Sequence, residues 1–564
     1  MTATDTYLLL RALCDELARS GLEHACTSPG SRCTPLVLSL VREPRIRCWS
    51  HLDERSAAFF ALGAAKAGGR PVAIACTSGT AAANFTPAVI EAFHARLPLL
   101  VLTADRPPEL RDVGAGQAID QLKLYGDAVK WFVEVGVDEA SEATLRWIRQ
   151  LACRAYITAR GGRPGPVHLN FPLREPLVLD SELPADPVPG RAGGRPWVST
   201  TRPGTPRAPT STRSLPPRTV IVAGRDERDA GLGAEAASLA DRGGYPLLAD
   251  PLSGARHSEQ AIARYDLLLR DPEFTGHARP ELVIRVGDLP TSKPLRAWLA
   301  SLTDTEQLAL DPECAWQDPS AAVTELDRGD PVQALARGEP SGPPDESWLE
   351  RWKTADDAVS AAIDTAIGDE LSEPQVAARL TEWLGPEATL FVASSMPIRD
   401  VELFAAAHRP GPRVLSNRGA NGIDGTVSSA FGVAAASPGP VVLLIGDVAL
   451  LHDLGGLLAA RRLGLELTIV LLNNDGGGIF HFLPVSGQTD AFEEHVATPH
   501  GTDFAQAAAL FGLGYQRPRN VAELRQAISE PDSAGIVEIR TDRGHNLELH
   551  RHIADAAMAA IRTS

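Results

Sequence analysis

The sequence predicts an α/β protein with three consecutive α/β domains, each built on a central parallel sheet. Apolar, β-branched segments alternate with helix-like segments, which is the pattern of strand–helix–strand units in such sheets. Two stretches rich in proline and glycine interrupt this alternation and divide the chain. A chain of 564 residues is also too long for a single hydrophobic core.

The first domain is expected to span residues 1–182. Its clearest strand–helix–strand unit consists of a strand at 72–78, a helix over 80–96 and a strand at 97–105. The segment GPVHLNFP at 165–172 supplies one more short strand. The chain begins with an amphipathic, helix-like stretch that contains acidic residues, which argues against a signal peptide.

Residues 183–217 are expected to form an extended linker, because their proline-rich composition cannot build a core. A central α/β domain is expected at 218–345. Its strands are predicted at 218–224, 281–288 and 306–311.

The third domain is expected to span residues 346–564. Four apolar segments are its predicted strands, at 388–395, 439–447, 467–474 and 534–541. Helix-like segments lie between them, so this domain is also expected to contain a parallel sheet.

The composition excludes several classes of function. A formal net charge of −17 disfavours nucleic acids and anionic membranes as partners. The sequence has no apolar run long enough to span a membrane, and its seven cysteines form no C-x-x-C pair. We therefore expect a cytoplasmic protein with reduced thiols. If its substrates are anions, the site needs a local cluster of arginine or lysine to oppose the overall charge.

Oxygen-bearing residues follow two of the predicted strands in the third domain. Gly446-Asp447 ends one strand, and Asn473-Asn474 ends the next, before three glycines at 476–478. The intervening crossover places both strand ends at one edge of a parallel sheet, where ligands of such sheets bind. A carboxylate, an amide oxygen and a backbone carbonyl suit magnesium, and glycines allow the backbone to approach a diphosphate. The alternative is an ordinary βα turn.

Three further stretches could bind or activate a ligand. The loop CTSPGSRCTPLVLSL (26–40) predicts a strand end and a helix capped by Thr34, with Arg32 and free amides forming an anion pocket. CTSGTAAANF (76–85) repeats the arrangement, with Thr80 as the expected cap. Glu54 opens an alanine-rich helix, where an acidic residue is also favoured by the helix dipole.

The Gly-Asp pair, the following 25 residues and Asn-Asn together resemble the signature of thiamine-diphosphate enzymes such as transketolases, pyruvate decarboxylases and acetolactate synthases. Val448 stands where that signature usually has glycine. The resemblance implies the thiamine-diphosphate-binding fold, with a pyrimidine-binding first domain and a diphosphate- and metal-binding third domain. It also implies thiamine diphosphate with Mg²⁺ or Mn²⁺, and a glutamate that contacts the aminopyrimidine ring and assists proton removal.

The residues that the resemblance assigns to cofactor binding are Pro29, Glu54, Thr80, Asn84, Ser394, Gly422, Ile423, Gly446, Asp447, Asn474, Gly476, Gly477 and Ile479. Among them Asp447, Asn474 and Gly476 are the expected metal ligands. Ile423 is expected to fill the bend between the two cofactor rings. In relatives the site is shared between subunits, which implies a homodimer or homotetramer.

Further motifs, including SPGSR, ADRPPEL, SMPIRD and NRGANGIDG, resemble the branch of this family that serves menaquinone biosynthesis. That branch decarboxylates 2-oxoglutarate and adds the remaining succinyl semialdehyde unit to isochorismate. Both substrates are dianions, which arginine binds through two parallel hydrogen bonds. The implied catalytic and substrate-contacting residues are Glu54, Ser31, Arg32, Arg106, Gln117, Lys293, Ser395, Arg399 and Arg418.

Three alternatives remain at this point, of which a catalytically inactive scaffold is disfavoured by the presence of Glu54, Asp447 and Asn474. Within the family, the alternative is an acetolactate-type 2-oxo acid decarboxylase or carboligase. Outside the family, GLGAEA at 231–236 matches the glycine pattern of a dinucleotide-binding oxidoreductase. That match is weak because six residues separate the glycines from the preceding strand, whereas a dinucleotide turn follows its strand directly.

Overall fold

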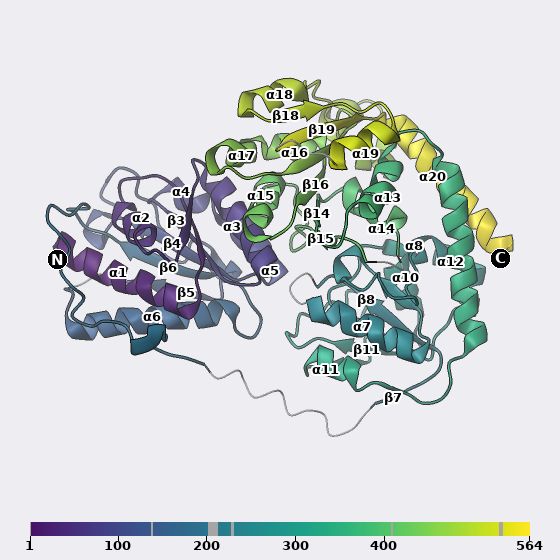
Figure 1. Cartoon of the computed structure of the whole chain (residues 1–564), viewed down its shortest axis with the longest axis horizontal. Helices are drawn as coiled ribbons and strands as arrows, with labels where there is room; N and C mark the ends of the chain where they lie inside the picture. The colour runs from purple at the N-terminus through teal and green to yellow at the C-terminus, as the bar shows by residue number, and fades with distance from the viewer. Residues whose placement is uncertain are drawn as a thin grey trace. The chain divides into compact units, whose positions relative to one another are not determined.

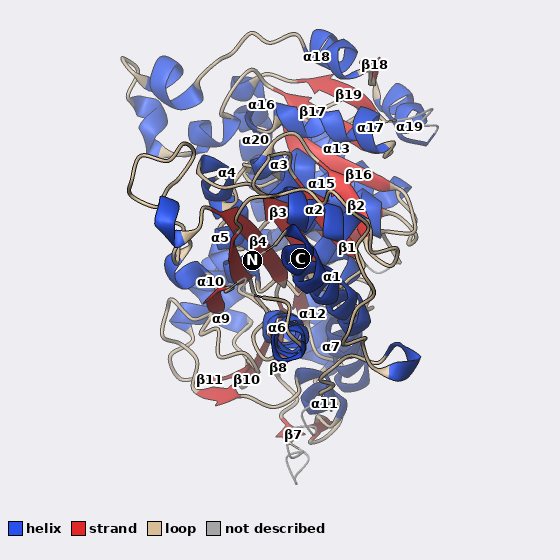
Figure 2. Ribbon diagram, turned by 90° about the vertical axis from the view of Figure 1, so that its left-hand side faces the viewer, coloured by secondary structure: helices blue, strands red, loops and turns tan. Residues whose placement is uncertain are grey.

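The computed structural model describes residues 2–136, 139–200, 213–226, 230–407, 410–529 and 534–563 (Figure 1). Within these residues, all paired strands are parallel, and Figure 2 shows helices packed around them. The predicted α/β fold class with parallel sheets is therefore confirmed. Two compact units result: unit 1 is Met1–Arg202, Asn417–Pro438 and Leu451–Glu466, and unit 2 is Pro203–Ser416, Gly439–Leu450 and Leu467–Ser564.

The first sheet lies in unit 1 and has the strand order β2-β1-β3-β4-β6-β5. Its strands are β1 (His24–Thr27), β2 (Arg47–Ser50), β3 (Val72–Cys76), β4 (Leu99–Asp105), β5 (Trp131–Glu134) and β6 (Val167–Pro172). Its helices are α1 (Ala3–Ser20), α2 (Thr34–Val41), α3 (Glu54–Gly68), α4 (Thr80–Ala83), α5 (Thr86–Ala95) and α6 (Glu142–Arg160). Helices α1 and α6 pack side by side, whereas α3 packs against β1 and β3 (Figure 1).

The central sheet has the order β12-β11-β10-β8-β9. Its strands are β8 (Thr219–Ala223), β9 (Leu247–Ala249), β10 (Leu282–Val286), β11 (Glu306–Leu310) and β12 (Glu325–Asp327). Its helices are α7 (Ala230–Gly243), α8 (Tyr265–Leu268), α9 (Pro272–His277), α10 (Lys293–Ser301) and α11 (Pro331–Ala336). A separate two-stranded pair joins β7 (Ser214–Leu215) to β13 (Glu339–Pro340).

The third sheet has the order β15-β14-β16-β17-β19-β18, which repeats the connectivity of the first sheet strand for strand. Its strands are β14 (Thr389–Val392), β15 (Arg413–Leu415), β16 (Val441–Gly446), β17 (Thr468–Asn473), β18 (Gly514–Gln516) and β19 (Gly535–Arg540). The helices of this region are α12 (Glu346–Ile367), α13 (Glu373–Trp383), α14 (Met396–Phe404), α15 (Thr426–Ala436), α16 (Asp447–His452), α17 (Leu458–Leu463), α18 (Phe504–Phe511), α19 (Val521–Ser529) and α20 (Arg543–Thr563).

In unit 2 the central sheet and the third sheet share one continuous hydrophobic core. Helix α12 contacts both regions: its fully buried Trp352 makes T-shaped contacts with Phe274 and Trp298 of the central region, and the helix packs against α20 of the third region. The ring centroids lie 5.0 and 6.0 Å apart, respectively. This shared core explains why the two sheets form a single compact unit.

Helix α15 follows the third-region strand β15 in sequence, yet it packs in unit 1 against α3. Glycines allow this close approach. A Cβ added at Gly63 would lie 1.9 Å from the carbonyl oxygen of Ser429, and one added at Gly432 would lie 1.9 Å from that of Phe60. Helix α3, which begins at Glu54, therefore packs with its backbone in direct contact with the backbone of α15.

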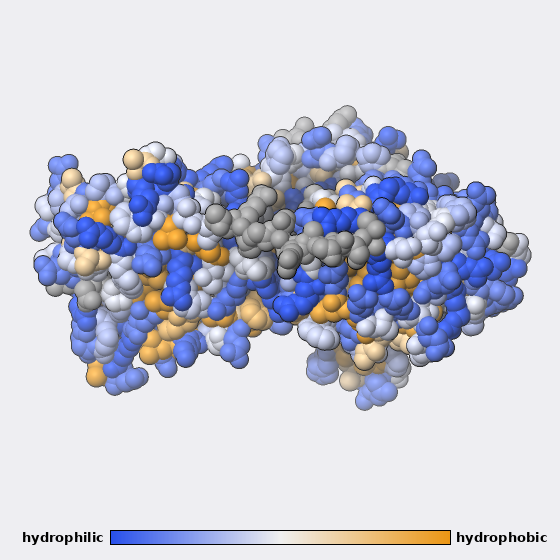
Figure 3. Space-filling model, turned by 90° about the horizontal axis from the view of Figure 1, so that it is seen from below, coloured by the Kyte–Doolittle hydropathy of each residue, from blue (hydrophilic) through white to orange (hydrophobic). Residues whose placement is uncertain are grey.

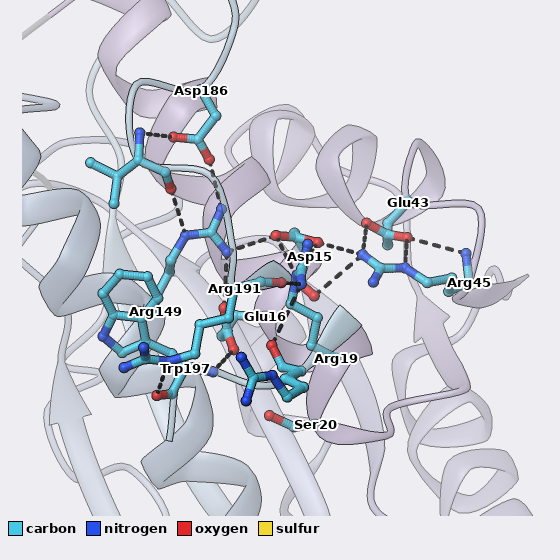
Figure 4. A network of polar contacts seen from close by, with 12 residues as sticks. Asp15, Glu16, Arg19, Ser20, Glu43, Arg45, Arg149, Asp186, Arg191 and Trp197 are labelled. Atoms are coloured by element: carbon cyan, nitrogen blue, oxygen red, sulfur yellow. Dashed lines mark hydrogen bonds and ion pairs between the residues drawn. The ribbon is translucent and has the colours of Figure 1, made fainter. Parts of the chain in front are cut away.

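A buried ion network fixes part of the expected linker onto unit 1 (Figure 4). Arg149 of α6 is 1% exposed and donates to Asp15, Glu16 and Asp186 at 2.6, 2.9 and 2.7 Å. Val188 is buried in the same core, so residues around 186–188 pack against the domain. Residues 201–212 of the expected linker lie outside the described residues.

Two local expectations were wrong. The helix expected over 80–96 is broken into α4 and α5 at Phe85, beside Pro87. Neither threonine is a helix cap: α2 begins at Thr34 after Cys33, and α4 begins at Thr80 after Gly79. In both cases no side-chain hydrogen bond caps the helix.

The surface of the described residues is mainly hydrophilic on the face drawn in Figure 3, with hydrophobic side chains in small groups. No described helix combines the length and the apolar character that crossing a bilayer requires. All seven cysteines are unpaired, as expected.

Candidate active site

Three neighbouring strands of the third sheet end in the predicted diphosphate residues. Strand β16 pairs with β14 on one side and with β17 on the other. Because all three run parallel, their carboxyl ends meet at one edge of the sheet. Ser394 follows β14, Asp447 follows β16, and Asn473 ends β17. The sheet thus brings these residues together within unit 2.

Asp447 joins the two loops at this edge. Its Oδ1 accepts from the N–H of Val448 at 2.7 Å, and its Oδ2 accepts from those of Asn474 and Gly476 at 3.1 and 3.0 Å. The carboxylate is buried, and burial raises its pKa, while the backbone donors lower it. His500 Nε2 lies 3.3 Å from Oδ2.

The two consecutive asparagines have different roles. Asn473 uses both ends of its amide: Nδ2 donates to Glu538 at 2.6 Å, and Oδ1 accepts from the N–H of Asp475 at 3.1 Å. The Oδ1 atom of Asn474 is buried, and no hydrogen-bond partner is found for it among the described residues. A buried amide oxygen without a partner is costly, so this atom has the properties of a metal ligand.

The residues present therefore fit a hard divalent cation. Asp447 offers a carboxylate, Asn474 an unpartnered amide oxygen, and Gly476 a carbonyl that already accepts from Gly478 at 3.0 Å. In the described part of the chain, no group of three or more histidines, cysteines, aspartates or glutamates could hold a metal ion. A site built from one carboxylate and neutral oxygens differs from such a group, and it matches the donors that magnesium prefers.

Glycine at 476 is required by the protein itself. Its φ of +142° is a conformation that L side chains rarely adopt, and a Cβ there would lie 2.4 Å from the carbonyl oxygen of Ala497. The N–H of Gly477 donates to the same carbonyl at 2.7 Å. Close packing on Ala497 therefore accounts for glycine at 476, in addition to the predicted approach of a diphosphate.

A cavity of about 520 Å³ in unit 2 brings together three of the predicted residues: Lys293, Arg399 and Ile479. Its wall is otherwise largely apolar, with Phe404, Phe482 and Leu483 among the lining residues. Burial lowers the pKa of Arg399, whereas the charge of Asp400 raises it. The lining also includes Arg270 and Arg551, so four cationic side chains outnumber the acidic Asp266 and Glu402, and the cavity suits an anionic organic substrate.

The turn at the start of α14 is strained. Ser395 has a φ of +79°, which is rare for a residue other than glycine, and its carbonyl accepts a hydrogen bond from Arg399 Nη1. Strain of this kind is concentrated at functional sites, because the surrounding structure must hold it.

In unit 1, the predicted residues of the first domain follow the carboxyl ends of β1, β2, β3 and β4. Pro29, Ser31 and Arg32 follow β1, and Arg106 follows β4. Arg32 is buried and donates from Nη1 to the carbonyl of Leu173 at 2.8 Å. Burial lowers the pKa of Arg32, and so does the nearby charge of Arg106. Two cations are therefore held close to each other at this edge.

The loop that carries Gln117 packs on the turn after β3. Gln117 Nε2 donates to the carbonyl of Ser78 at 3.0 Å, and Ser78 Oγ donates back to the carbonyl of Gln117 at 2.9 Å. Thr80 and Asn84, at the two ends of α4, are exposed. The Arg106 guanidinium donates to the carbonyl of Gly116 at 3.0 Å.

Glu54 is the first residue of α3, and Asp53 caps that helix by accepting from the N–H of Ser56 at 3.1 Å. Burial raises the pKa of Glu54 above its usual value, its own backbone N–H lowers it, and the charge of Asp53 raises it. A carboxylate with a raised pKa is suited to exchanging a proton near neutral pH.

The loop with Arg418, Gly422 and Ile423 also belongs to unit 1. The Glu91 carboxylate accepts from the N–H groups of Gly419 and Ala420 at 2.7 and 2.6 Å. The buried Asp453 accepts from the N–H of Ser428 in α15 at 2.7 Å, and burial raises the pKa of Asp453 to about 6.

The predicted residues thus form two sets. Unit 1 contains Pro29, Ser31, Arg32, Glu54, Thr80, Asn84, Arg106, Gln117, Arg418, Gly422 and Ile423. Unit 2 contains Lys293, Ser394, Ser395, Arg399, Gly446, Asp447, Asn474, Gly476, Gly477 and Ile479. Sequence reasoning did not single out Glu373 and His500, which contact Asn474 and Asp447, or Glu91 and Asp453, which hold backbone N–H groups in the same segment as Arg418 and Ile423. Glu91 lies in the family-like stretch TSGTAAANFTPAVIEA (77–92), but the contacts of all four residues are visible only in the structure.

Three family models match the chain. They are the N-terminal TPP binding domain of thiamine pyrophosphate enzymes at residues 9–124, the middle domain of thiamine pyrophosphate at 193–392, and the C-terminal TPP binding domain at 400–534. Together with the fold, they define a thiamine pyrophosphate enzyme, so thiamine pyrophosphate (thiamine diphosphate) is the cofactor. The GLGAEA stretch lies inside helix α7, which leaves the dinucleotide interpretation without support.

Three curated relatives carry the same name, 2-succinyl-5-enolpyruvyl-6-hydroxy-3-cyclohexene-1-carboxylate synthase. The protein from Chloroflexus aurantiacus is 42% identical, over 96% of this chain and 94% of its own length. That from Geobacillus kaustophilus is 43% identical over 96% of each chain, and that from Halobacterium salinarum is 42% identical over 98% of this chain and 99% of its own. The chain therefore belongs to the family of these synthases.

Proposed function

We propose that this chain decarboxylates 2-oxoglutarate and adds the remaining succinyl semialdehyde unit to the alkene of isochorismate. The product is 2-succinyl-5-enolpyruvyl-6-hydroxy-3-cyclohexene-1-carboxylate, an intermediate of menaquinone biosynthesis. The observation that carries this proposal is the 42% identity to the C. aurantiacus synthase over 96% of the chain. The chain works in the cytoplasm, which agrees with its acidic composition and unpaired cysteines.

Thiamine diphosphate supplies a nucleophilic carbon and an electron sink when it is bound. The chain's part is to hold that group. Asp447, Asn474 and the carbonyl of Gly476 bind Mg²⁺ or Mn²⁺, as supported by the unpartnered Oδ1 of Asn474. Glu54 holds and exchanges a proton at the aminopyrimidine ring, as supported by its raised pKa.

The cationic side chains orient the two dianionic substrates. Lys293 and Arg399 line one cavity in unit 2, and Arg32 and Arg106 lie near each other in unit 1. Arg418, Ser31, Gln117 and Ser395 complete this substrate-binding set. Such groups supply positive charge where negative charge develops during addition, and the apolar wall of the cavity limits access of water.

The functional unit is a homo-oligomer, a dimer or a tetramer, in which the site is shared between subunits. This proposal is supported by the two separate TPP binding domains that match the chain, of which the N-terminal one covers Glu54 and the C-terminal one covers Asp447. Size-exclusion chromatography with light scattering measures the oligomeric state directly. A monomer that is fully active would overturn this part of the proposal.

The decisive assay incubates the protein with 2-oxoglutarate and isochorismate, with and without thiamine diphosphate and Mg²⁺. Product formation that requires all components supports the proposed reaction. Carbon dioxide release that proceeds equally well without isochorismate would instead indicate a simple 2-oxo acid decarboxylase. Product formation without thiamine diphosphate would contradict the assigned chemistry.

A further inference from the structure

The amide of Asn474 is held by a carboxylate from a distant part of the chain. Glu373, the first residue of α13, accepts from Asn474 Nδ2 through its Oε1 at 2.9 Å. The same Oε1 accepts from Thr541 Oγ1 at 2.7 Å. Glu373 is 1% exposed, so these contacts lie in the protein interior.

This contact decides which way the amide of Asn474 faces. The Oε1 atom of Glu373 is the acceptor in both contacts, so it pairs with the NH₂ end of the amide. The oxygen end must then face the opposite way, and it is the buried Oδ1 atom without a partner. The direction of Asn474 Oδ1 therefore depends on Glu373 as well as on Asn474 itself.

Asn473 provides an internal comparison. Its Nδ2 donates to another fully buried carboxylate, that of Glu538, at 2.6 Å. However, its Oδ1 accepts from the N–H of Asp475, so that oxygen already has a protein partner, unlike Asn474 Oδ1. Both asparagines therefore make the same carboxylate–amide contact, but only the Oδ1 atom of Asn474 is left without a partner among the described residues.

We infer that Glu373 is a positioning residue that presents the Oδ1 atom of Asn474 to the divalent metal ion, with Thr541 restraining the Glu373 carboxylate. This inference rests on the metal site proposed above and extends it to a residue outside the ligand set. Removal of a partner that orients a metal ligand typically costs about 10- to 100-fold in metal affinity.

The test measures Mn²⁺ binding to the full-length protein by the electron paramagnetic resonance signal of unbound Mn²⁺, with saturating thiamine diphosphate. Glu373→Met removes the acceptor, and we expect the Mn²⁺ dissociation constant to rise about 10- to 100-fold. Glu373→Gln keeps an Oε1 acceptor for Asn474, so it should lose less affinity. Circular dichroism and the urea unfolding midpoint, measured without Mn²⁺, report separately on folding.

The matched control is Glu538→Gln, which alters the equivalent contact to Asn473. It should change the urea midpoint while leaving Mn²⁺ affinity within about threefold of the wild type, because Asn473 supplies no ligand. Unchanged Mn²⁺ affinity in Glu373→Met would overturn the inference alone. A wild-type protein that binds no Mn²⁺ would overturn the proposed metal site, and this inference with it.

A second variant pair tests the contact even if Glu373→Met folds poorly. Asn474→Asp places two carboxylates against each other when Glu373 is present, whereas the amide introduced by Glu373→Gln could donate to the new carboxylate. We compare the fold-change in Mn²⁺ affinity that Asn474→Asp causes in the wild type and in Glu373→Gln. This change should be at least about tenfold more favourable in Glu373→Gln. Equal effects in both backgrounds would show that the two side chains are not coupled and would overturn the inference.

Discussion

The carboxylate of Glu91 in α5 accepts a hydrogen bond from the backbone N–H of Gly419 at 2.7 Å, although 328 residues separate them in sequence. Its second oxygen accepts from Ala420. A Cβ at Gly419 would lie 2.5 Å from the carbonyl oxygen of Glu91, so only glycine allows this approach. The helix thus holds the loop that carries Arg418 and Ile423.

Glu91→Ala should destabilise unit 1 by about 2–3 kcal/mol, because the N–H groups of Gly419 and Ala420 lose a buried, charged acceptor. Activity should fall as well, since the loop with Arg418 is released. Urea unfolding and kcat/KM measure the two effects. Glu142→Ala, which removes an exposed ion pair with Arg146, should change stability by less than about 0.5 kcal/mol. Equal effects of the two substitutions would contradict the assigned role of Glu91.

Glu54→Gln should lower kcat by about 10²- to 10⁴-fold, because a neutral amide cannot exchange the proton. Affinity for thiamine diphosphate, measured by calorimetry, should change far less than kcat. Asp53→Ser is the control, since serine also caps helices but carries no charge. Full activity of Glu54→Gln would refute the proton role.

Arg399→Ala should lower kcat/KM for 2-oxoglutarate by the equivalent of about 2–5 kcal/mol if a substrate carboxylate is buried against it. Steady-state kinetics with isochorismate held at saturation measure this loss. Arg379→Ala removes an arginine whose partner is the surface residue Glu382, so it should leave kcat/KM nearly unchanged. A similar loss in both variants would indicate a general charge effect.

Gly63→Ala should destabilise unit 1 by about 1–3 kcal/mol, because the new methyl group collides with the Ser429 carbonyl and separates α3 from α15. Gly68→Ala lies in the same helix with open space around it and should be neutral or slightly stabilising. Thermal unfolding of both variants checks this prediction. It fails if Gly63→Ala is as stable as Gly68→Ala.

Burial lowers the pKa of His168 from 6.5 to about 3 in the folded chain. An unfolded chain binds this proton below pH 6.5, whereas the folded chain does not, so stability falls as the pH drops from 6.5 towards 3. At pH 5 the free energy of unfolding is about 2 kcal/mol lower than at about pH 7. Glutamine at position 168 cannot titrate. Between about pH 7 and pH 5, the free energy of unfolding measured in urea should therefore fall by about 2 kcal/mol less in His168→Gln than in the wild type. Parallel pH profiles would contradict this.

Strand positions were predictable because buried parallel strands are continuous apolar runs. Strand β17, expected at 467–474, occupies Thr468–Asn473, and β16, expected at 439–447, occupies Val441–Gly446. Short strands with mixed composition, such as β2 and β18, escaped prediction. The common connectivity of the first and third sheets was also invisible, because topology depends on strand pairing and leaves no repeat in the sequence.

The sequence by itself determined the class of fold, the cofactor family and the residues at the carboxyl ends of the strands, because these depend on local pattern and on motifs of adjacent residues. Only the tertiary structure showed that Glu373 and Glu538 hold the two amide NH₂ groups, and that Asn473 Oδ1 accepts from the N–H of Asp475 whereas Asn474 Oδ1 has no partner among the described residues. It likewise decided that α15 packs on α3 and that Glu91 holds the Gly419 loop. Such contacts join residues that are far apart in the chain. Their strength depends on burial, which a local sequence pattern does not specify.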